Sequence, residues 1–218
     1  MGMKKWTVGK YDRDKVVSLS EECELPIMAA LVLCSRGIDT REAVNSFLNG
    51  KEELADPYTF ADMDKAVDRI EQAIDNGEKI AVYGDYDVDG VTSTTLVCSY
   101  LDIRGADVIF YIPDREKEGY GLNADGIDKL KEKGVSLIVT VDNGIAAIEE
   151  SKYAASLGID MVITDHHIPG RAIPEAIAVV DPHRSDCPSK FKDYAGVGVA
   201  FKLICALEGA DSESEMLE

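Results

Sequence analysis

Short apolar runs alternate with helix-length segments along most of the chain. From Lys79 onward, five runs rich in β-branched residues each end at polar or turn residues, and they span 80–83, 108–112, 137–141, 161–164 and 177–180. Runs that are apolar throughout are typical of parallel strands buried on both faces, and the intervening segments suit crossover helices at 91–103, 124–133 and 146–157. The pattern therefore predicts an α/β fold: a doubly wound, mostly parallel sheet with helices on both faces.

The first part of the chain follows a different pattern. Residues 1–60 contain helix-like patterns around 26–34 and 40–48, so we expect a small helical N-terminal appendage there. A further helix at 62–76 stops at Gly77, a common helix-terminating residue, and leads into the first strand. The sheet is therefore expected to be preceded by helices only.

The main α/β domain is expected to cover residues 61–210. Its last helix, at 199–207, follows a turn that contains Gly196 and Gly198. Residues 211–218 are acidic and poor in apolar side chains, which indicates an acidic tail or a truncation point. We expect the domain to be incomplete at its C-terminal end.

Composition indicates a globular protein that stays inside the cell. The chain has 218 residues, of which 45% are hydrophobic, enough for one substantial core and a smaller appendage. No run approaches the roughly 20 apolar residues of a membrane-spanning helix, and the first residues carry no apolar signal core. The five cysteines are widely spaced without a C-x-x-C pair, which is typical of reduced thiols. We therefore expect a cytoplasmic protein without membrane contacts.

The net charge of −18 bears on any nucleic-acid hypothesis. Nonspecific affinity for a phosphate backbone comes mainly from Lys and Arg side chains that displace counterions. An acidic chain can still act on nucleic acid in two ways. Either divalent cations neutralise its acidic site, or the basic strand-binding surface belongs to regions outside this chain.

Three carboxylates follow the first strand within five residues: Asp85, Asp87 and Asp89. Grouping like charges so closely is unfavourable unless a cation balances them, and oxygen ligands suit Mg²⁺ or Mn²⁺. A solvated acidic turn is the alternative interpretation of this segment alone.

Acidic residues recur at the ends of two later strands. Asp142 follows the third strand, and Asp165, His166 and His167 follow the fourth. A single Asp after a strand is commonly a helix cap, and a single His is more often a core residue than a ligand. Because the carboxyl ends of parallel strands meet at one edge of a sheet, the recurrence favours a shared metal site.

These motifs resemble those of the DHH phosphoesterase superfamily. The resemblance rests on Asp87-Val-Asp-Gly90, Val141-Asp-Asn-Gly144 and Asp165-His-His167, in this order. Further segments at 83–92, 113–115, 118–122 and 195–203 resemble the branch of single-strand-specific 5′ to 3′ DNA exonucleases. The resemblance identifies 61–210 as a DHH phosphoesterase domain and implies hydrolysis of the DNA backbone by water activated at two metal ions.

The resemblance also implies residue roles. It makes Asp87 a ligand of one metal ion, Asp89 and His166 ligands of the second, and Asp142 a bridge between them, with Mn²⁺ or Mg²⁺ as the ions. The implied supporting and substrate-facing groups are Asp165 and His167, with Arg115 meeting a phosphate.

The sequence departs from the family pattern at two places. Tyr83 stands where some superfamily members have a histidine ligand, and Asp85 is a candidate to compensate. The family's final metal-binding aspartate belongs to a motif beyond the last helix, and Asp181, in an Asp-Pro turn, is the candidate substitute. We therefore expect the isolated chain to be weakly active or inactive.

Several alternatives remain open. A haloacid dehalogenase-like phosphatase would use Asp87 as its nucleophile, because Asp87-Val-Asp-Gly-Val91 fits that family's loop. Other DHH enzymes act on short RNA, cyclic dinucleotides or pyrophosphate, and a noncatalytic DHH scaffold is a further alternative. For the exonuclease, the implied partners are single-stranded DNA, held mainly by regions absent here, and a helicase or single-strand-binding protein in DNA repair and recombination.

Overall fold

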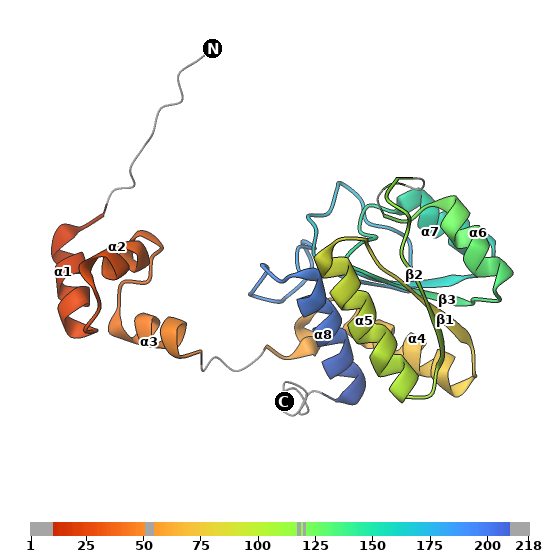
Figure 1. Cartoon of the computed structure of the whole chain (residues 1–218), viewed down its shortest axis with the longest axis horizontal. Coiled ribbons are helices and arrows are strands. Elements are labelled where there is room, and N and C mark those ends of the chain that lie inside the picture. Colours follow the sequence, from red (N-terminus) through yellow and green to blue (C-terminus); the bar gives the residue numbers. More distant parts are fainter. Residues whose placement is uncertain (1–10, 51–54, 117–118, 120, 210–218) are drawn as a thin grey trace, which may run out of the picture. The chain divides into compact units, whose positions relative to one another are not determined.

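The computed structural model describes residues 11–50, 55–116, 119 and 121–209 (Figure 1). The chain divides into two compact units, Met1–Leu54 and Ala55–Glu218. The division falls a few residues before Phe60, which packs into the core of the second unit. Each unit has its own hydrophobic core.

Within residues 11–50, the first unit contains three helices, α1 (Arg13–Glu22), α2 (Ile27–Ser35) and α3 (Arg41–Asn49). Thr40 caps α3, because its side-chain oxygen accepts a hydrogen bond from the Ala43 N–H at 3.2 Å. The unit's small core consists of Val16, Leu19, Ala30, Leu33 and Val44. The predicted helical character of this region is confirmed, while α1 is a helix that the sequence pattern did not predict.

The described part of the second unit is built on five parallel strands: β1 (Lys79–Tyr83), β2 (Asp107–Tyr111), β3 (Leu137–Val141), β4 (Asp160–Thr164) and β5 (Ala178–Val180). Their order in the sheet is β2-β1-β3-β4-β5, and each neighbouring pair is parallel. This arrangement confirms the predicted α/β class and the five predicted strands.

Helices cover both faces of the sheet, as predicted. The 3-10 turn η1 (Pro57–Thr59) leads into α4 (Met63–Asp75), which shares one core with α5 (Val88–Ile103) and α8 (Gly196–Glu208). On the other face pack α6 (Ala124–Glu132) and α7 (Ile148–Ser156), which lie together in Figure 1. Alternate β1 residues enter the two cores, because successive strand side chains point to opposite faces.

The strand order places a topological switch point between β1 and β3. From β1 the chain crosses to β2 on one side, and from β3 it crosses to β4 on the other, so connections leave the adjacent strands in opposite directions. Ligands of open α/β sheets bind at such a switch point. The acidic motifs that follow β1 and β3 lie at the strand ends that flank this switch point.

Two composition-based expectations are also addressed by the structure. All five cysteines are free thiols. Within the described parts of the chain, no helix is long and apolar enough to cross a membrane.

Candidate metal centre

The loop after β1 packs directly against α5. A side chain at Gly84 would place its Cβ 1.9 Å from Thr94 Oγ1, and one at Gly90 would place it 2.5 Å from the Asp85 carbonyl oxygen. This close packing buries the Asp85 side chain, and its Oδ1 accepts no hydrogen bond from the described residues. Burial, with a contribution from the charge of Asp87, raises the pKa of Asp85.

Backbone N–H groups at two helix N-termini donate hydrogen bonds to Asp87 and to Asp89, which lies in the first turn of α5. Asp87 caps α5, and its Oδ1 accepts the Gly90 N–H at 2.9 Å. Asp89 accepts two N–H groups from the first turn of α8, from Gly196 at 2.7 Å and from Val197 at 2.8 Å. The positive end of the α8 dipole therefore stabilises the charge of Asp89.

Asp142 lies at the centre of the site, where β3 ends. Its backbone has φ of 61°, an uncommon left-handed conformation, and its side chain is 2% exposed. A Cβ at Gly196 would lie 2.3 Å from Asp142 Oδ1, so the glycine lets α8 approach this carboxylate. Burial raises the pKa of Asp142 to about 8, with further contributions from Asp89 and Asp87.

The adjacent Asn143 joins the ends of β1 and β3. Its Nδ2 donates hydrogen bonds to the carbonyl oxygens of Tyr83 at 3.2 Å and Val141 at 3.0 Å. Thr140 Oγ1 donates to the Asn143 carbonyl at 2.8 Å. These bonds fix the turn that carries Asp142.

The imidazole of His166 faces the carboxylates with one nitrogen. Its Nδ1 lies 2.8 Å from the Tyr194 carbonyl, which can only accept, so Nδ1 carries a proton. Its Nε2 lies 3.0 Å from Asp142 Oδ1 and 3.9 Å from Asp89 Oδ2. A histidine oriented in this way through its outer nitrogen is typical of a metal ligand.

Asp165 accepts hydrogen bonds from the residues next to it and from the loop after β3. One oxygen accepts His167 Nδ1–H at 2.7 Å and the His166 N–H at 2.7 Å, while the other accepts the Ile145 N–H at 2.9 Å. Burial opposes ionisation of Asp165, but the bonds from His167 and Ile145 outweigh it and lower its pKa. The same pairing with Asp165 raises the pKa of His167 to about 9.

Most of the predicted residues gather in two overlapping groups. Ligand atoms of Asp142, His166 and His167 lie within 4.8 Å of one another, and so do those of Asp85, Asp87 and Asp142. Asp142 belongs to both groups. Asp89 adjoins the first group through His166, at 3.9 Å.

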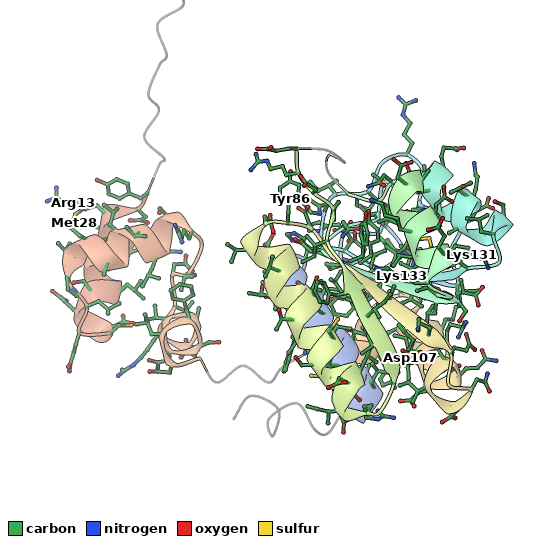
Figure 2. All side chains as sticks on the ribbon, turned by 45° about the vertical axis from the view of Figure 1, so that its right-hand side comes forward. Arg13, Met28, Tyr86, Asp107, Lys131 and Lys133 are labelled. Atoms are coloured by element: carbon green, nitrogen blue, oxygen red, sulfur yellow. The ribbon has the colours of Figure 1, made fainter. Side chains whose placement is uncertain are left out.

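Three other candidate residues lie outside these groups. Tyr83 Oη donates to the Gly121 carbonyl at 3.2 Å, in the core on the α6 face. The Arg115 guanidinium lies 5.2 Å from the centre of the Tyr86 ring, a residue labelled in Figure 2. Asp181 is buried at the end of β5, and burial raises its pKa to about 7.

The contact between Asp89 and α8 was not predicted. The sequence shows Gly196 and Gly198 before an apolar helix, a pattern that indicates a turn. These glycines were the available signal, because a glycine is required where a backbone approaches another group closely. The pairing itself joins residues more than a hundred positions apart and leaves no local pattern.

The parallel sheet and the acidic groups at its strand ends are those of a metal-dependent phosphoesterase domain. Residues 79–218 match the N-terminal domain of the DHH family, and the chain belongs to that family. Several curated relatives of the chain are RecJ proteins. The chain is 50% identical over 206 residues to the single-stranded-DNA-specific exonuclease RecJ of Bacillus subtilis strain 168, covering 94% of this chain and 26% of the relative. The RecJ of Escherichia coli K12 is 37% identical over 185 residues, covering 84% of this chain and 32% of the relative.

Solved structures agree with these relatives. Exonuclease RecJ bound to manganese has a TM-score of 0.65 at 35% identity, covering 72% of this chain and 39% of that chain. RecJ in complex with Mn²⁺ from Thermus thermophilus has a TM-score of 0.69 at 29% identity, covering 92% of this chain and 28% of that chain. The predicted resemblance is confirmed. The chain spans between a quarter and a third of the length of the curated relatives described above.

Proposed function

We propose that this chain forms the metal-binding catalytic domain of a 5′ to 3′ exonuclease that hydrolyses single-stranded DNA. The observation that carries the proposal is the pair of ligand groups that share Asp142 at the β1/β3 switch point. Two cations held by one shared carboxylate are a recurring arrangement in enzymes that cleave phosphate esters.

The donor set fits divalent cations. Several carboxylates lie together, and two of their oxygens are buried without a hydrogen-bond donor in the described part of the chain. Asp85 Oδ1 accepts no hydrogen bond from the described residues, and Asp142 Oδ1 lies 3.0 Å from His166 Nε2, which carries no proton in a neutral imidazole whose Nδ1 is protonated. Leaving such oxygens without a positive partner is costly. Carboxylates with one imidazole suit Mn²⁺ and Mg²⁺, and both ions occur in the RecJ structures from Thermus thermophilus.

Each proposed ion has its own ligands and shares one carboxylate. Asp87 would hold one ion, with Asp85 as a candidate second ligand, and Asp142 would bridge. His166 and Asp89 would hold the other ion. Asp89 already accepts two N–H groups, but a carboxylate offers about four lone-pair positions and can serve both partners.

The remaining polar residues are assigned to support and to substrate. Bound divalent cations supply charge that neutralises a phosphate and activates water for attack. Asp165 orients His167, whose side chain is 46% exposed and available to a substrate phosphate. Arg115, stacked near Tyr86, is proposed as a second phosphate contact.

The wider assignments belong to the same proposal. Residues 61–210 are proposed as the catalytic domain and 1–60 as its helical appendage. Single-stranded DNA is the proposed substrate, with a helicase or single-strand-binding protein as partner in the cytoplasm. Family membership favours metal-assisted hydrolysis over an aspartyl-phosphate on Asp87, and the RecJ relatives favour DNA over short RNA, cyclic dinucleotides or pyrophosphate.

Calorimetric titration with Mn²⁺ tests the proposed site. The wild-type chain is expected to bind Mn²⁺, and His166→Ala is expected to weaken binding about 100-fold, a loss at the upper end of that measured for groups that support a metal ligand. His183→Ala is the matched control, because His183 lies outside both ligand groups. Equal affinity in all three proteins, or no metal-dependent heat in the wild type, would refute the assignment.

Digestion of 5′-phosphorylated single-stranded DNA with Mn²⁺ tests the reaction. A chain extended at its C-terminus, as in the longer relatives, is expected to digest the strand, and Asp142→Asn in the same extended chain is expected to abolish digestion. Unchanged digestion by the variant would show that the reaction does not use this site.

A further inference from the structure

A cavity of about 350 Å³ adjoins the proposed metal centre. It lies on the α7 side of the sheet, between the loops that follow β3 and β4 and the segment before α6. Its size falls within the range of about 300–1,000 Å³ that is usual for small-molecule sites. Most of its lining residues have no role in the proposed metal centre.

The cavity and the metal centre share a side chain. His167 lines the cavity, and its ring nitrogen lies within 4.8 Å of ligand atoms of Asp142 and His166. Asp165, which holds His167 in place, lines it too. A substrate whose phosphate lies at the metal centre can therefore place its next chemical group in this cavity.

The walls of the cavity are mainly apolar. Leu122, Ile145 and Ala147 are largely buried and line it, and the side chain of Ile168 lines it although it is 82% exposed. A large aliphatic side chain held in solvent beside a cavity supplies a contact surface for a flat ligand. The exposed imidazole of His167 is a surface on which a base can stack.

The polar side chains of the cavity are mostly hydrogen-bond acceptors. Glu150, in the first turn of α7, contributes a carboxylate, and Asn143 contributes an amide oxygen, Oδ1, without a hydrogen-bond partner among the described residues. Asn143 Nδ2 is already used by two carbonyl groups. Glu150 and Asn143 therefore favour a ligand group that donates hydrogen bonds over a phosphate.

We propose that this cavity binds the nucleobase of the nucleotide being released, and that Glu150 favours adenine and cytosine over thymine. Adenine and cytosine carry exocyclic amino groups, N6 and N4, where thymine carries a carbonyl oxygen. A carboxylate accepts a hydrogen bond from the amino group and repels the carbonyl. This inference rests on the proposed function, since it takes the metal centre as the phosphate site.

Methyl NMR spectroscopy of the Mg²⁺-loaded chain tests the cavity without relying on catalysis. The probes are dAMP, dTMP and 2-deoxyribose 5-phosphate, which lacks a base. The methyl signals of Leu122, Ile145 and Ile168 are expected to shift with dAMP and to stay in place with the base-free probe. The methyl group of Ile70, in the core on the opposite face, is the internal control.

Substitution of Glu150 tests the base preference. In the wild-type chain, dAMP is expected to bind about fivefold more tightly than dTMP, a modest gain for one charge-assisted hydrogen bond at a partly exposed site. Glu150→Ala is expected to bring that ratio close to one. Glu149→Gln is the matched control on the same helix, because Glu149 is exposed, pairs with Lys152 and does not line the cavity. The ratio is the decisive quantity, since removing either charge also strengthens phosphate binding.

The outcomes separate this inference from the proposed function. If the base-free probe shifts the same methyl signals as dAMP, or if the probes bind without shifting them, the nucleobase site is refuted while the metal centre stands. If neither Mg²⁺ nor any phosphate probe binds, the proposed function fails. Deoxyadenosine then tests the cavity alone, and the absence of methyl shifts refutes it.

Discussion

Replacing Asp142 by asparagine is expected to stabilise the metal-free protein. The carboxyl group is buried, and its pKa is raised to about 8, whereas an unfolded chain would have an Asp pKa of about 3.9. Between these values the folded state binds more protons than the unfolded state, so the free energy of unfolding falls as pH rises from about 4 to about 8. The Asp142→Asn substitution would remove this loss, and the advantage of the variant should grow over the same pH range.

The size of the effect follows from the shift in pKa. Four pH units at about 1.4 kcal/mol per unit set an upper limit of about 5.6 kcal/mol. Relaxation around the charge and entry of water reduce such penalties, so we expect about 2 kcal/mol at pH 8. Asparagine has nearly the same shape and tolerates the left-handed backbone with φ of 61°, so the substitution changes the charge without new strain.

Hydrogen exchange of the central strands gives the required measurement. Amide protection of β1 and β3 in EDTA, at pH 5 and pH 8, reports the stability of the second unit separately from the first. Asp102→Asn is the control, because Asp102 is exposed on α5 and should change stability by less than about 0.5 kcal/mol. With Mn²⁺ at 100 times its dissociation constant, the wild type should gain about 2.7 kcal/mol and Asp142→Asn much less. A variant no more stable than the control at pH 8 would refute the reasoning.

Three further predictions concern packing and electrostatics. Gly196→Ala should destabilise the second unit by about 1–3 kcal/mol in urea unfolding, because its Cβ would lie 2.3 Å from a buried carboxylate oxygen, and Gly198→Ala, where the nearest atom lies at 3.3 Å, should cost less. Asp165→Asn should lower the pKa of His167 from about 9 by about 1–2 units in an NMR titration, and an unchanged value would contradict the assigned pairing. Leu130→Ala, in the core under α6, should cost about 2–5 kcal/mol in urea unfolding, and a loss below about 1 kcal/mol would contradict its burial.

Much of the sheet could be predicted because strands buried on both faces are recognisable from their local composition. The predicted run 80–83 differs from β1 by one residue, and the runs that became β3 and β4 agree as closely. Each is apolar on both faces, and that pattern depends only on the two helical layers being present. The α1 helix was missed because polar residues dominate it and only Val16 and Leu19 are buried.

The first residues of α5 and α8 were harder to predict, because the residues at these helix starts also contact the carboxylates of the site. The helix expected at 91–103 begins at Val88, because Asp87 is both a candidate ligand and a helix cap. Likewise, α8 begins at Gly196 and not at Val199, because the glycine has room to approach a carboxylate. Residues that serve a site depart from local rules, so local rules are weakest there.

Most individual long-range contacts within the site could not be predicted from the sequence. The burial of Asp85, the bonds from α8 to Asp89 and the cavity beside Ile145 all depend on which loops the topology brings together. The sequence predicted that acidic strand ends would meet, because parallel strands share an edge. It did not predict which oxygens would lack hydrogen-bond donors.

The carboxylate oxygens of the site differ in how their negative charge is compensated. Helix N-termini compensate Asp87 and Asp89, since α5 and α8 donate backbone N–H groups to them. The compensation does not extend to two other buried oxygens. Asp85 Oδ1 accepts no hydrogen bond from the described residues, and Asp142 Oδ1 lies 3.0 Å from His166 Nε2, which carries no proton in the neutral imidazole. A net charge of −18 disfavours phosphate binding, so in the proposed function the cations that balance these oxygens also supply the attraction for the substrate phosphate. Under that proposal, the cost of leaving these buried oxygens without a cation and the affinity for a nucleotide phosphate both depend on the same bound ions.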